Sequence, residues 1–147
     1  MFDWIFRKIN EFCEPTFEEC VQGASQGEPR AQYYLSEHYH SGTRVPQDYK
    51  RARELLSASA LGGYPAAQVI LSGWYQHGVV GFTQDLVLAY AWNGVAALSS
   101  NRFWQSRAIE NRRELEQKMS VEDIERAQEL TRKFLEEIES SENRWVE

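Results

Sequence analysis

The residues best suited to metal binding or nucleophilic chemistry are three histidines and two cysteines. They are His38, His40, His77, Cys13 and Cys20. His38 and His40 are two positions apart, so on a helix they point to different faces, and no His-x-x-x-His pair occurs. The glutamates near both cysteines oppose formation of a reactive thiolate. We expect no catalytic residue, no metal site and no bound cofactor.

Motifs of the common enzyme classes are missing from the sequence as well. There is no Gly-x-Ser-x-Gly, no phosphate-binding loop and no Gly-x-Gly-x-x-Gly. Two cysteines do not make a disulfide framework, and the position of Cys20 on an apolar helical stripe predicts a buried free thiol. A function carried by a protein surface is the better expectation.

The charge balance argues against nucleic acid as the partner. The chain of 147 residues has 16 Lys and Arg against 22 Asp and Glu, a net charge of −6. Nucleic-acid binding needs clustered basic residues. The basic residues here alternate with acids, as between Arg107 and Lys118, which predicts a solvated helix face.

The sequence contains an internal repeat, and the helices of that repeat are the elements that would position a binding surface. The first copy occupies 27–62 and the second 63–99. The first copy contains Ala31, Leu35, Tyr39, Gly42, Asp48, Ala52, Leu55 and Ala60. The second contains Ala67, Leu71, Tyr75, Gly78, Asp85, Ala89, Trp92 and Ala97. The offset is 36 residues up to the glycine and 37 after it, so one residue is added before Asp85, where a loop would absorb it.

Each copy is predicted to form two helices. Pro29 suits the first turn of a helix whose apolar stripe falls at i, i+4 and i+8. Gly42 ends that helix, and Asp48 is a good N-cap for a second one. The apolar face of such a pair needs a neighbouring pair to cover it, which predicts a stacked array.

The flanks of the repeats are also predicted to be helical. Phe2, Ile5, Phe6 and Ile9 give the N-terminal stretch an amphipathic pattern. That helix either caps the open end of the array or docks on a membrane surface or partner. Residues 15–26 read as a half-repeat, which completes an N-terminal unit over 1–26. Residues 100–140 read as a long helical pair, followed by a polar tail over 141–147.

The residues shared by the two copies resemble Sel1-like repeats, which are relatives of the tetratricopeptide repeat. Ser36 and Ser72 replace the glycine that usually follows the leucine, a change that conserves small size. The resemblance implies a single all-α domain over 1–147, a right-handed α-solenoid of antiparallel helix pairs with about eight helices. It also implies a bacterial protein, and the lack of an export signal predicts a cytoplasmic one.

In related repeats, the first helices of successive pairs line a concave groove. The resemblance implies that Tyr33, Glu37 and His40 line it in the first copy, and Val69, Gly73 and Gln76 in the second. The flanking residues are Arg30, Tyr34, His38 and Trp74. An exposed Trp74 and Tyr34 beside Arg30 would suit a bound peptide or a helix of a partner. Replacing Tyr33 or Trp74 by alanine would then weaken binding without unfolding the chain. The alternative is that Trp74 packs on the neighbouring helix.

The resulting prediction is a non-catalytic module that binds a partner protein or peptide, as an adaptor or regulatory scaffold. A second hypothesis is a small acidic immunity or inhibitor protein, because a net charge of −6 would suit a basic toxin or enzyme. A third is a β-lactamase-like hydrolase, as in cysteine-rich relatives. The two clear copies lack the paired cysteines of those relatives.

Overall fold

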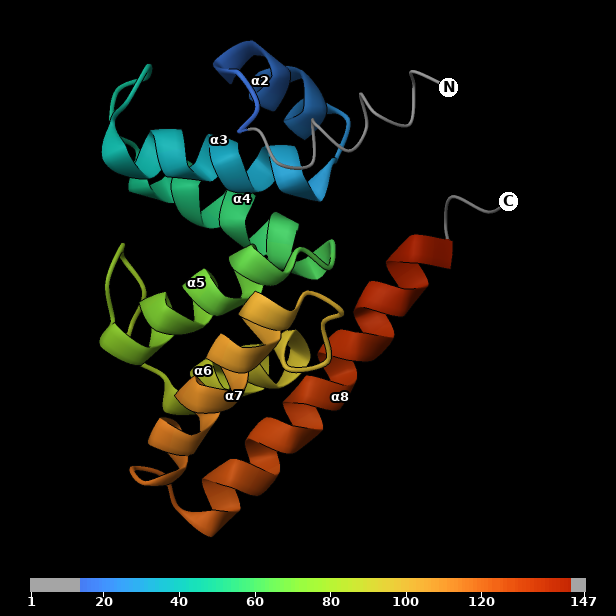
Figure 1. The fold of residues 1–147 in the computed structure, drawn as a ribbon. Helices are drawn as coiled ribbons and strands as arrows, with labels where there is room; N and C mark the ends of the chain where they lie inside the picture. The colour runs from blue at the N-terminus through green and yellow to red at the C-terminus, as the bar shows by residue number, and fades with distance from the viewer. Residues whose placement is uncertain (1–13, 144–147) are drawn as a thin grey trace.

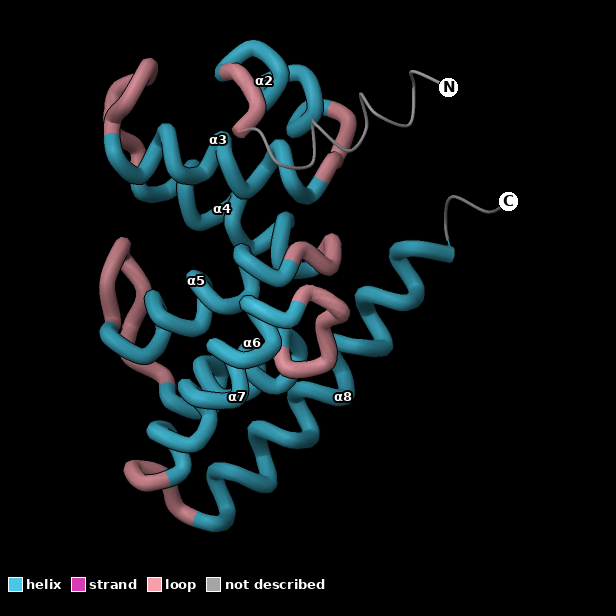
Figure 2. The backbone as a smooth tube through the Cα atoms, viewed as in Figure 1, coloured by secondary structure: helices cyan, strands magenta, loops and turns pink. Residues whose placement is uncertain are grey.

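A computed structural model of the chain describes residues 14–143, which form helices joined by loops (Figures 1 and 2). The helices are α2 (Phe17–Ser25), α3 (Pro29–Ser41), α4 (Tyr49–Leu61), α5 (Pro65–His77), α6 (Leu86–Ala96), α7 (Arg102–Glu116) and α8 (Val121–Asn143). No strand occurs within 14–143. The all-α prediction is confirmed. The predicted N-terminal amphipathic helix lies outside the described residues.

The two sequence copies become two stacked helix pairs. In the first copy α3 packs on α4, in the second α5 packs on α6, and α4 packs on α5 to join the pairs (Figure 1). The N-terminal half-repeat contributes α2, which packs on α3. The array is therefore a solenoid in which each unit covers the apolar face of the next.

Local residue chemistry sets where these helices begin and end. Gly42 and Gly78 close α3 and α5 in the left-handed conformation, with φ of 72° and 62°. The carboxylates of Asp48 and Asp85 accept backbone N–H groups in the first turns of α4 and α6, at 3.1 Å and 2.9 Å. These predictions of helix ends from the sequence are confirmed.

The residue added in the second copy lies in the loop between α5 and α6. Val80 and Gly81 both have positive φ there, at 56° and 78°. The side chain of Val80 is buried in the core, and Arg53 of α4 donates a hydrogen bond to its carbonyl at 2.9 Å. The longer loop thus turns back onto the first repeat and fastens the two pairs together.

Small residues allow the helices of the core to approach closely. Ala52, Ala60 and Ala67 are fully buried between the repeats, beside the larger Leu56 and Leu71. The sequence prediction placed Leu55 on the buried face of α4, but Leu55 is only half-buried and Leu56 is the buried leucine. The helix is rotated so that the position after the predicted one points inward.

Buried hydroxyl groups join helices within each pair. Ser59 donates to the carbonyl of Pro29 at 2.6 Å, and Ser72 donates to the carbonyl of Ala89 at 2.8 Å. Asn93 occupies the position in α6 that Leu56 holds in α4, and its amide donates to Ser72. The small polar residues of the repeats therefore satisfy their own hydrogen bonds inside the core.

The C-terminal helices both pack on α6 but diverge from each other. They meet near the turn that joins them, where Leu115 of α7, Met119 of the turn, and Ile124 and Ala127 of α8 belong to one apolar cluster. From there α8 runs across α6 and reaches α4 (Figure 1). The predicted helices of this region are present, but α8 is a brace across the repeats and not a close antiparallel partner of α7.

Close approach of α8 to α6 depends on a glycine and on stacked rings. A Cβ atom at Gly94 would lie 2.5 Å from the hydroxyl of Thr131, so any larger residue would force the two helices or the Thr131 side chain to shift. One turn of α8 further on, Phe134 stacks on Trp92 with ring centroids 4.3 Å apart. Ile138 then enters the core shared by both repeats.

Candidate binding site

A cavity of about 510 Å³ opens between the start of the described chain, α3 and the beginnings of α5 and α7. We call it the aromatic cavity because of the rings that line it. These are Phe17, Tyr33, Tyr34, His38, Tyr64 and Trp104. All six side chains are partly buried, so each presents some ring surface to an occupant.

The tyrosines form a connected group within the cavity. The ring of Tyr33 lies 5.2 Å from that of Tyr34 and 5.2 Å from that of Tyr64, both at tilted or edge-on angles. Such geometry is favourable for aromatic pairs. Because the rings support one another, they are held in place before any ligand arrives.

Three elements position these rings. Tyr33 and Tyr34 lie on α3, Tyr64 directly precedes α5, and Trp104 lies in the first turn of α7. Helix α7 is fixed there because the side chain of Asn101 accepts hydrogen bonds from two backbone N–H groups of its first turn. The stacking of units thus brings together residues that are far apart in the sequence.

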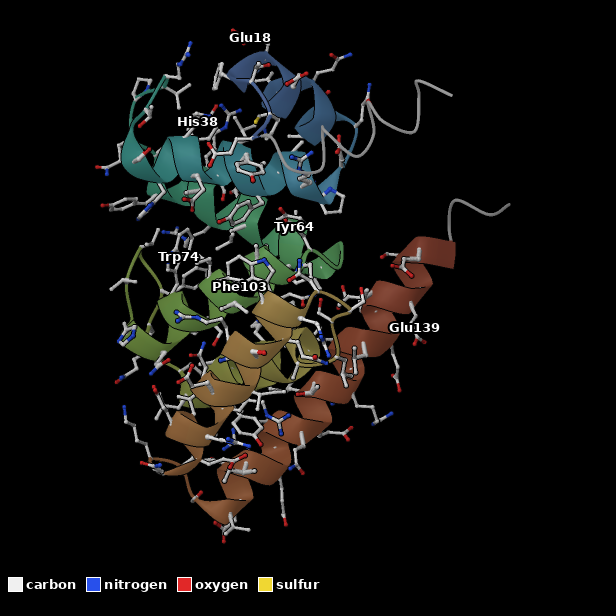
Figure 3. The ribbon with its side chains drawn as sticks, in the orientation of Figure 1. Glu18, His38, Tyr64, Trp74, Phe103 and Glu139 are labelled. Carbon is white, nitrogen blue, oxygen red and sulfur yellow. The ribbon has the colours of Figure 1, made fainter. Side chains whose placement is uncertain are left out.

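Exposed apolar side chains extend this surface past the cavity itself. Phe103 is 63% exposed, and its ring lies 4.9 Å from that of Trp104 in an edge-on contact. Leu98, just before α7, is 67% exposed. Figure 3 labels Phe103 and Tyr64 in the same part of the molecule, where α7 begins. A large apolar area here remains open to solvent.

The electrostatics of the cavity favour neutral tyrosine hydroxyl groups. Burial raises the pKa of Tyr33, and the nearby Glu37 carboxylate raises it further. Burial likewise raises the pKa of Tyr64. Both hydroxyl groups therefore stay protonated over the physiological range, and the Tyr33 hydroxyl can donate a hydrogen bond to a ligand.

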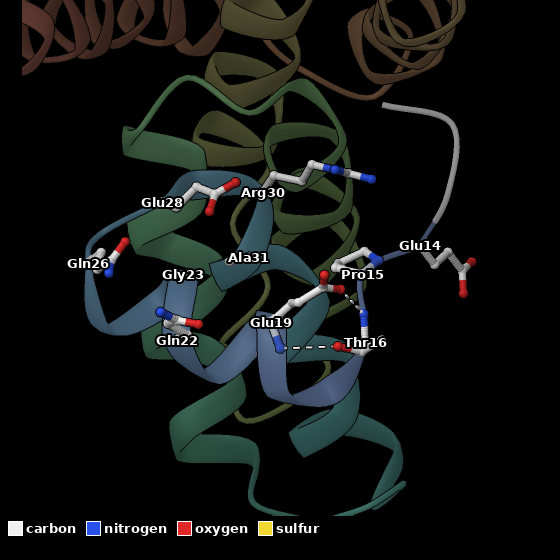
Figure 4. A pocket seen from close by; sticks show the side chains of 10 residues that line it. All are labelled: Glu14, Pro15, Thr16, Glu19, Gln22, Gly23, Gln26, Glu28, Arg30 and Ala31. Carbon is white, nitrogen blue, oxygen red and sulfur yellow. Dashed lines mark hydrogen bonds between the residues drawn. The ribbon is translucent and has the colours of Figure 1, made fainter. Parts of the chain in front are cut away.

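Four of the residues predicted from the sequence lie together in this cavity. They are Tyr33, Tyr34, Glu37 and His38. Arg30 lines a neighbouring polar cavity of about 480 Å³, shown in Figure 4. Its guanidinium carbon lies 5.7 Å from the centre of the Tyr34 ring, so Arg30 connects the two cavities.

The other predicted residues lie outside the aromatic cavity. Trp74 is only 7% exposed and its ring lies 5.3 Å from that of His40, so the expectation of an exposed Trp74 is wrong and it packs in the core. Val69 is 6% exposed because it packs against α7. Gly73 and Gln76, further along α5, line none of the cavity.

The sequence prediction of the groove missed Tyr64 and Trp104. Tyr64 occupies the link before Pro65, where the repeat pattern assigns no core or groove position. Trp104 lies within 100–140, where the sequence predicted a helical pair but no groove residue, and it borders the cavity. The adjacent aromatic residues Phe103 and Trp104 were the sequence feature that could have indicated this surface. Two neighbours on a helix cannot both face the core, so at least one had to be exposed.

The polar side chains at one edge of the 480 Å³ cavity cap the N-terminus of helix α2. The N–H of Thr16 donates to the carboxylate of Glu19 at 2.7 Å, and the N–H of Glu19 donates to the Thr16 hydroxyl at 3.3 Å (Figure 4). These hydrogen bonds lower the pKa of Glu19. The carboxylate is thus occupied by the start of α2.

Cys20 is a buried free thiol, as its helical position predicted. Burial, followed by the Glu19 carboxylate, raises the pKa of the thiol. Over 14–143, no group of three or more His, Cys, Asp or Glu side chains is arranged to hold a metal ion. Within the same range no helix combines the length and apolar character needed to cross a membrane.

Comparison with protein families matches residues 29–64 and 65–97 to the Sel1 repeat. The chain carries two Sel1 repeats. The matched ranges correspond to the α3–α4 and α5–α6 pairs with their links. Sel1 repeats are typically scaffolds for protein–protein interaction and are generally not catalytic.

Two solved structures resemble the chain. One is c5321, a protective antigen present in uropathogenic Escherichia coli strains that displays an SLR fold. It has a TM-score of 0.73 and 28% identity over 83% of this chain, which spans 25% of its length. The other is a Sel1 repeat protein from Oxalobacter formigenes, with a TM-score of 0.56 and 24% identity over 76% of this chain and 96% of its own. No curated protein matches the sequence.

Proposed function

We propose that this Sel1-repeat chain binds a partner protein or peptide in the aromatic cavity, as a non-catalytic adaptor or regulatory scaffold. The observation that carries the proposal is the convergence of half-buried rings from α3, from the link before α5 and from α7 on one open cavity. Tyrosine and tryptophan dominate the binding energy of many protein interfaces. The cavity volume of about 510 Å³ also lies within the range of roughly 300–1,000 Å³ typical of binding sites.

The residues around the cavity indicate what kind of ligand it would take. The rings of Tyr34 and Trp104 offer contact to an apolar or aromatic side chain. Glu37 and Arg44 at the edge carry opposite charges, and the Tyr33 hydroxyl group can donate to a backbone carbonyl. This combination suits a segment of polypeptide that inserts an apolar anchor and remains polar around it.

A second candidate function is an acidic inhibitor or immunity protein that neutralises a basic toxin or enzyme. The net charge of −6 supports it, because opposite charge speeds encounter with a basic partner. The two candidates differ in salt dependence. An inhibitor of this kind would associate much more slowly as ionic strength rises, whereas an anchor held by aromatic rings would show a weak dependence.

The test is retention of partners by the full chain in its native cells. Proteins that co-purify with wild type, Tyr34→Ala and Ile109→Ala are quantified by mass spectrometry, and the affinity of each enriched partner is then measured. Ile109 is an exposed apolar residue of α7 outside the cavity, so its variant is the matched control. We expect Tyr34→Ala to weaken binding by about tenfold or more, as loss of an interface anchor does. Equal affinities for all three proteins would refute the proposal.

A further inference from the structure

The described chain begins at the aromatic cavity. Glu14, Pro15 and Thr16 line it together with the aromatic rings. The thirteen residues before Glu14, which lie outside the described part, are joined to the chain at this edge of the cavity. The N-terminal segment is therefore covalently attached directly beside the aromatic cavity.

The sequence of that segment is suited to an apolar surface. Phe2, Ile5, Phe6 and Ile9 recur at i, i+3, i+4 and i+7, which gives one apolar side if the segment is helical. An amphipathic helix of this length is stable in water only when its apolar side is covered. If the segment is helical, it would need a surface that covers its apolar side.

The outer face of α2 is a poor surface for it. Val21, which is 45% exposed, is the large apolar side chain that α2 exposes, and it is surrounded by polar and acidic residues. A helix that capped the end of the solenoid would gain little apolar contact there. The role of an end cap, which the sequence suggested, has little support from the described part of α2.

The aromatic cavity offers much more apolar surface. Phe103 and Leu98 are each more than 60% exposed beside it. A second cavity of about 440 Å³ includes Leu98 and shares Tyr64 and Trp104 with the first, so the two cavities adjoin. Exposed apolar area of this kind is expected to be covered.

The distances permit the segment to fold back. Four residues lie between Ile9 and Glu14, so the five Cα–Cα steps can span up to about 17 Å when extended. As a helix, the stretch from Phe2 to Ile9 is only about 10 Å long. A short tether also gives an effective concentration on the order of millimolar, which favours binding within one chain over binding between two chains.

We propose that residues 2–13 dock within the same chain, with the apolar side of the segment in the aromatic cavity and against Phe103 and Leu98. This inference rests on the proposed function, since the segment then competes with a partner for the same rings. The occupant is the N-terminal segment in cis. A partner must displace it, so the affinity of the site is set by how firmly the segment is held.

The test compares three full-length chains: wild type, Phe6→Asp and Arg7→Gln. Both substitutions lower the net charge by one, but Phe6 lies on the apolar side of the segment and Arg7 on the opposite side. Hydroxyl-radical labelling followed by mass spectrometry reports the solvent exposure of the Phe103 and Leu98 side chains. We expect labelling of Phe103 and Leu98 to rise at least threefold in Phe6→Asp and to stay at the wild-type level in Arg7→Gln.

A binding experiment gives the second measurement. A fluorescein-labelled synthetic peptide of residues 1–13 should bind the Phe6→Asp chain about tenfold more tightly than wild type, because its competitor in cis is weakened. Adding Tyr34→Ala to Phe6→Asp should remove that gain. Equal labelling in all three chains, or equal peptide affinity for wild type and Phe6→Asp, would overturn the proposal.

Two further outcomes are informative. If protection of Phe103 falls on dilution and the chain sediments as a dimer, a second copy supplies the segment and the proposal in cis is wrong. If Phe6→Asp changes nothing while Tyr34→Ala still reduces partner retention, the self-docking inference fails and the proposed function stands. The converse outcome is that the segment protects Phe103 and Leu98 from labelling while Tyr34→Ala leaves the affinity for partners unchanged. That result would refute the proposed function and support the docking of the segment.

Discussion

Replacing Trp74 with alanine separates a core role from a binding role for this residue. Its side chain is 7% exposed, and its ring lies 5.3 Å from that of His40 and 6.2 Å from that of Phe82. Trp74→Ala would therefore leave a cavity within the core that joins the two Sel1 repeats. Val121 is the comparison, because it is an apolar residue outside the aromatic cavity that is 69% exposed.

The expected loss follows from burial. Truncation of a buried Trp typically costs about 3–5 kcal/mol, the sum of lost transfer free energy and the cavity left behind. A loss of about 4 kcal/mol would raise the unfolded-to-folded ratio by roughly three orders of magnitude. It would lower the melting temperature by roughly 8–16 °C for a chain of this size. Val121→Ala should change stability by about 0.5 kcal/mol or less, as exposed substitutions do.

Guanidinium unfolding monitored by circular dichroism at the helix band gives both free energies of unfolding. The helix signal is preferred over fluorescence because one variant removes a tryptophan. A loss below about 1 kcal/mol for Trp74→Ala, or equal losses for the two variants, would refute the burial argument. Trp74 would then have to be accessible, as the sequence comparison of groove positions suggested.

Two further predictions concern capping and the buried thiol. Asp85→Ala should cost about 1 kcal/mol in the same unfolding assay because α6 loses its N-cap, and Asp85→Asn should recover most of that; no change for the alanine variant would show that the cap is unimportant. In a Cys13→Ser background, a thiol reagent at pH 8 should modify Cys20 at least a hundredfold more slowly in the native chain than in denaturant, because burial raises its pKa and blocks access; rapid native modification would contradict this.

Most of the fold could be predicted because the repeat signals are local. Pro29, Gly42 and Asp48 each fix a helix end through their own backbone or side-chain chemistry, independent of the rest of the chain. The offset between the two copies also located the added residue in the loop before Asp85. These features require only neighbouring residues, which a sequence displays directly.

The candidate site was harder to predict because it depends on which elements cover which. Periodicity showed that Val69 and Trp74 share helix α5 with the groove positions, but not that α7 covers the first and the repeat core encloses the second. Tyr64 joins the site from a link that has no periodic position. Which side chains are buried by a neighbouring helix depends on how the helices pack, and helical spacing alone does not determine it.

The path of α8 determines how this short array of helix pairs unfolds. A simple solenoid has contacts only between adjacent units, so its ends can unravel one unit at a time. Here α8 packs on α6 in the second repeat and reaches α4 in the first, with Ile138 in the core that the two repeats share. Loosening either repeat therefore removes support from the other. A chain with only two repeats thereby gains the cooperativity of a globular domain.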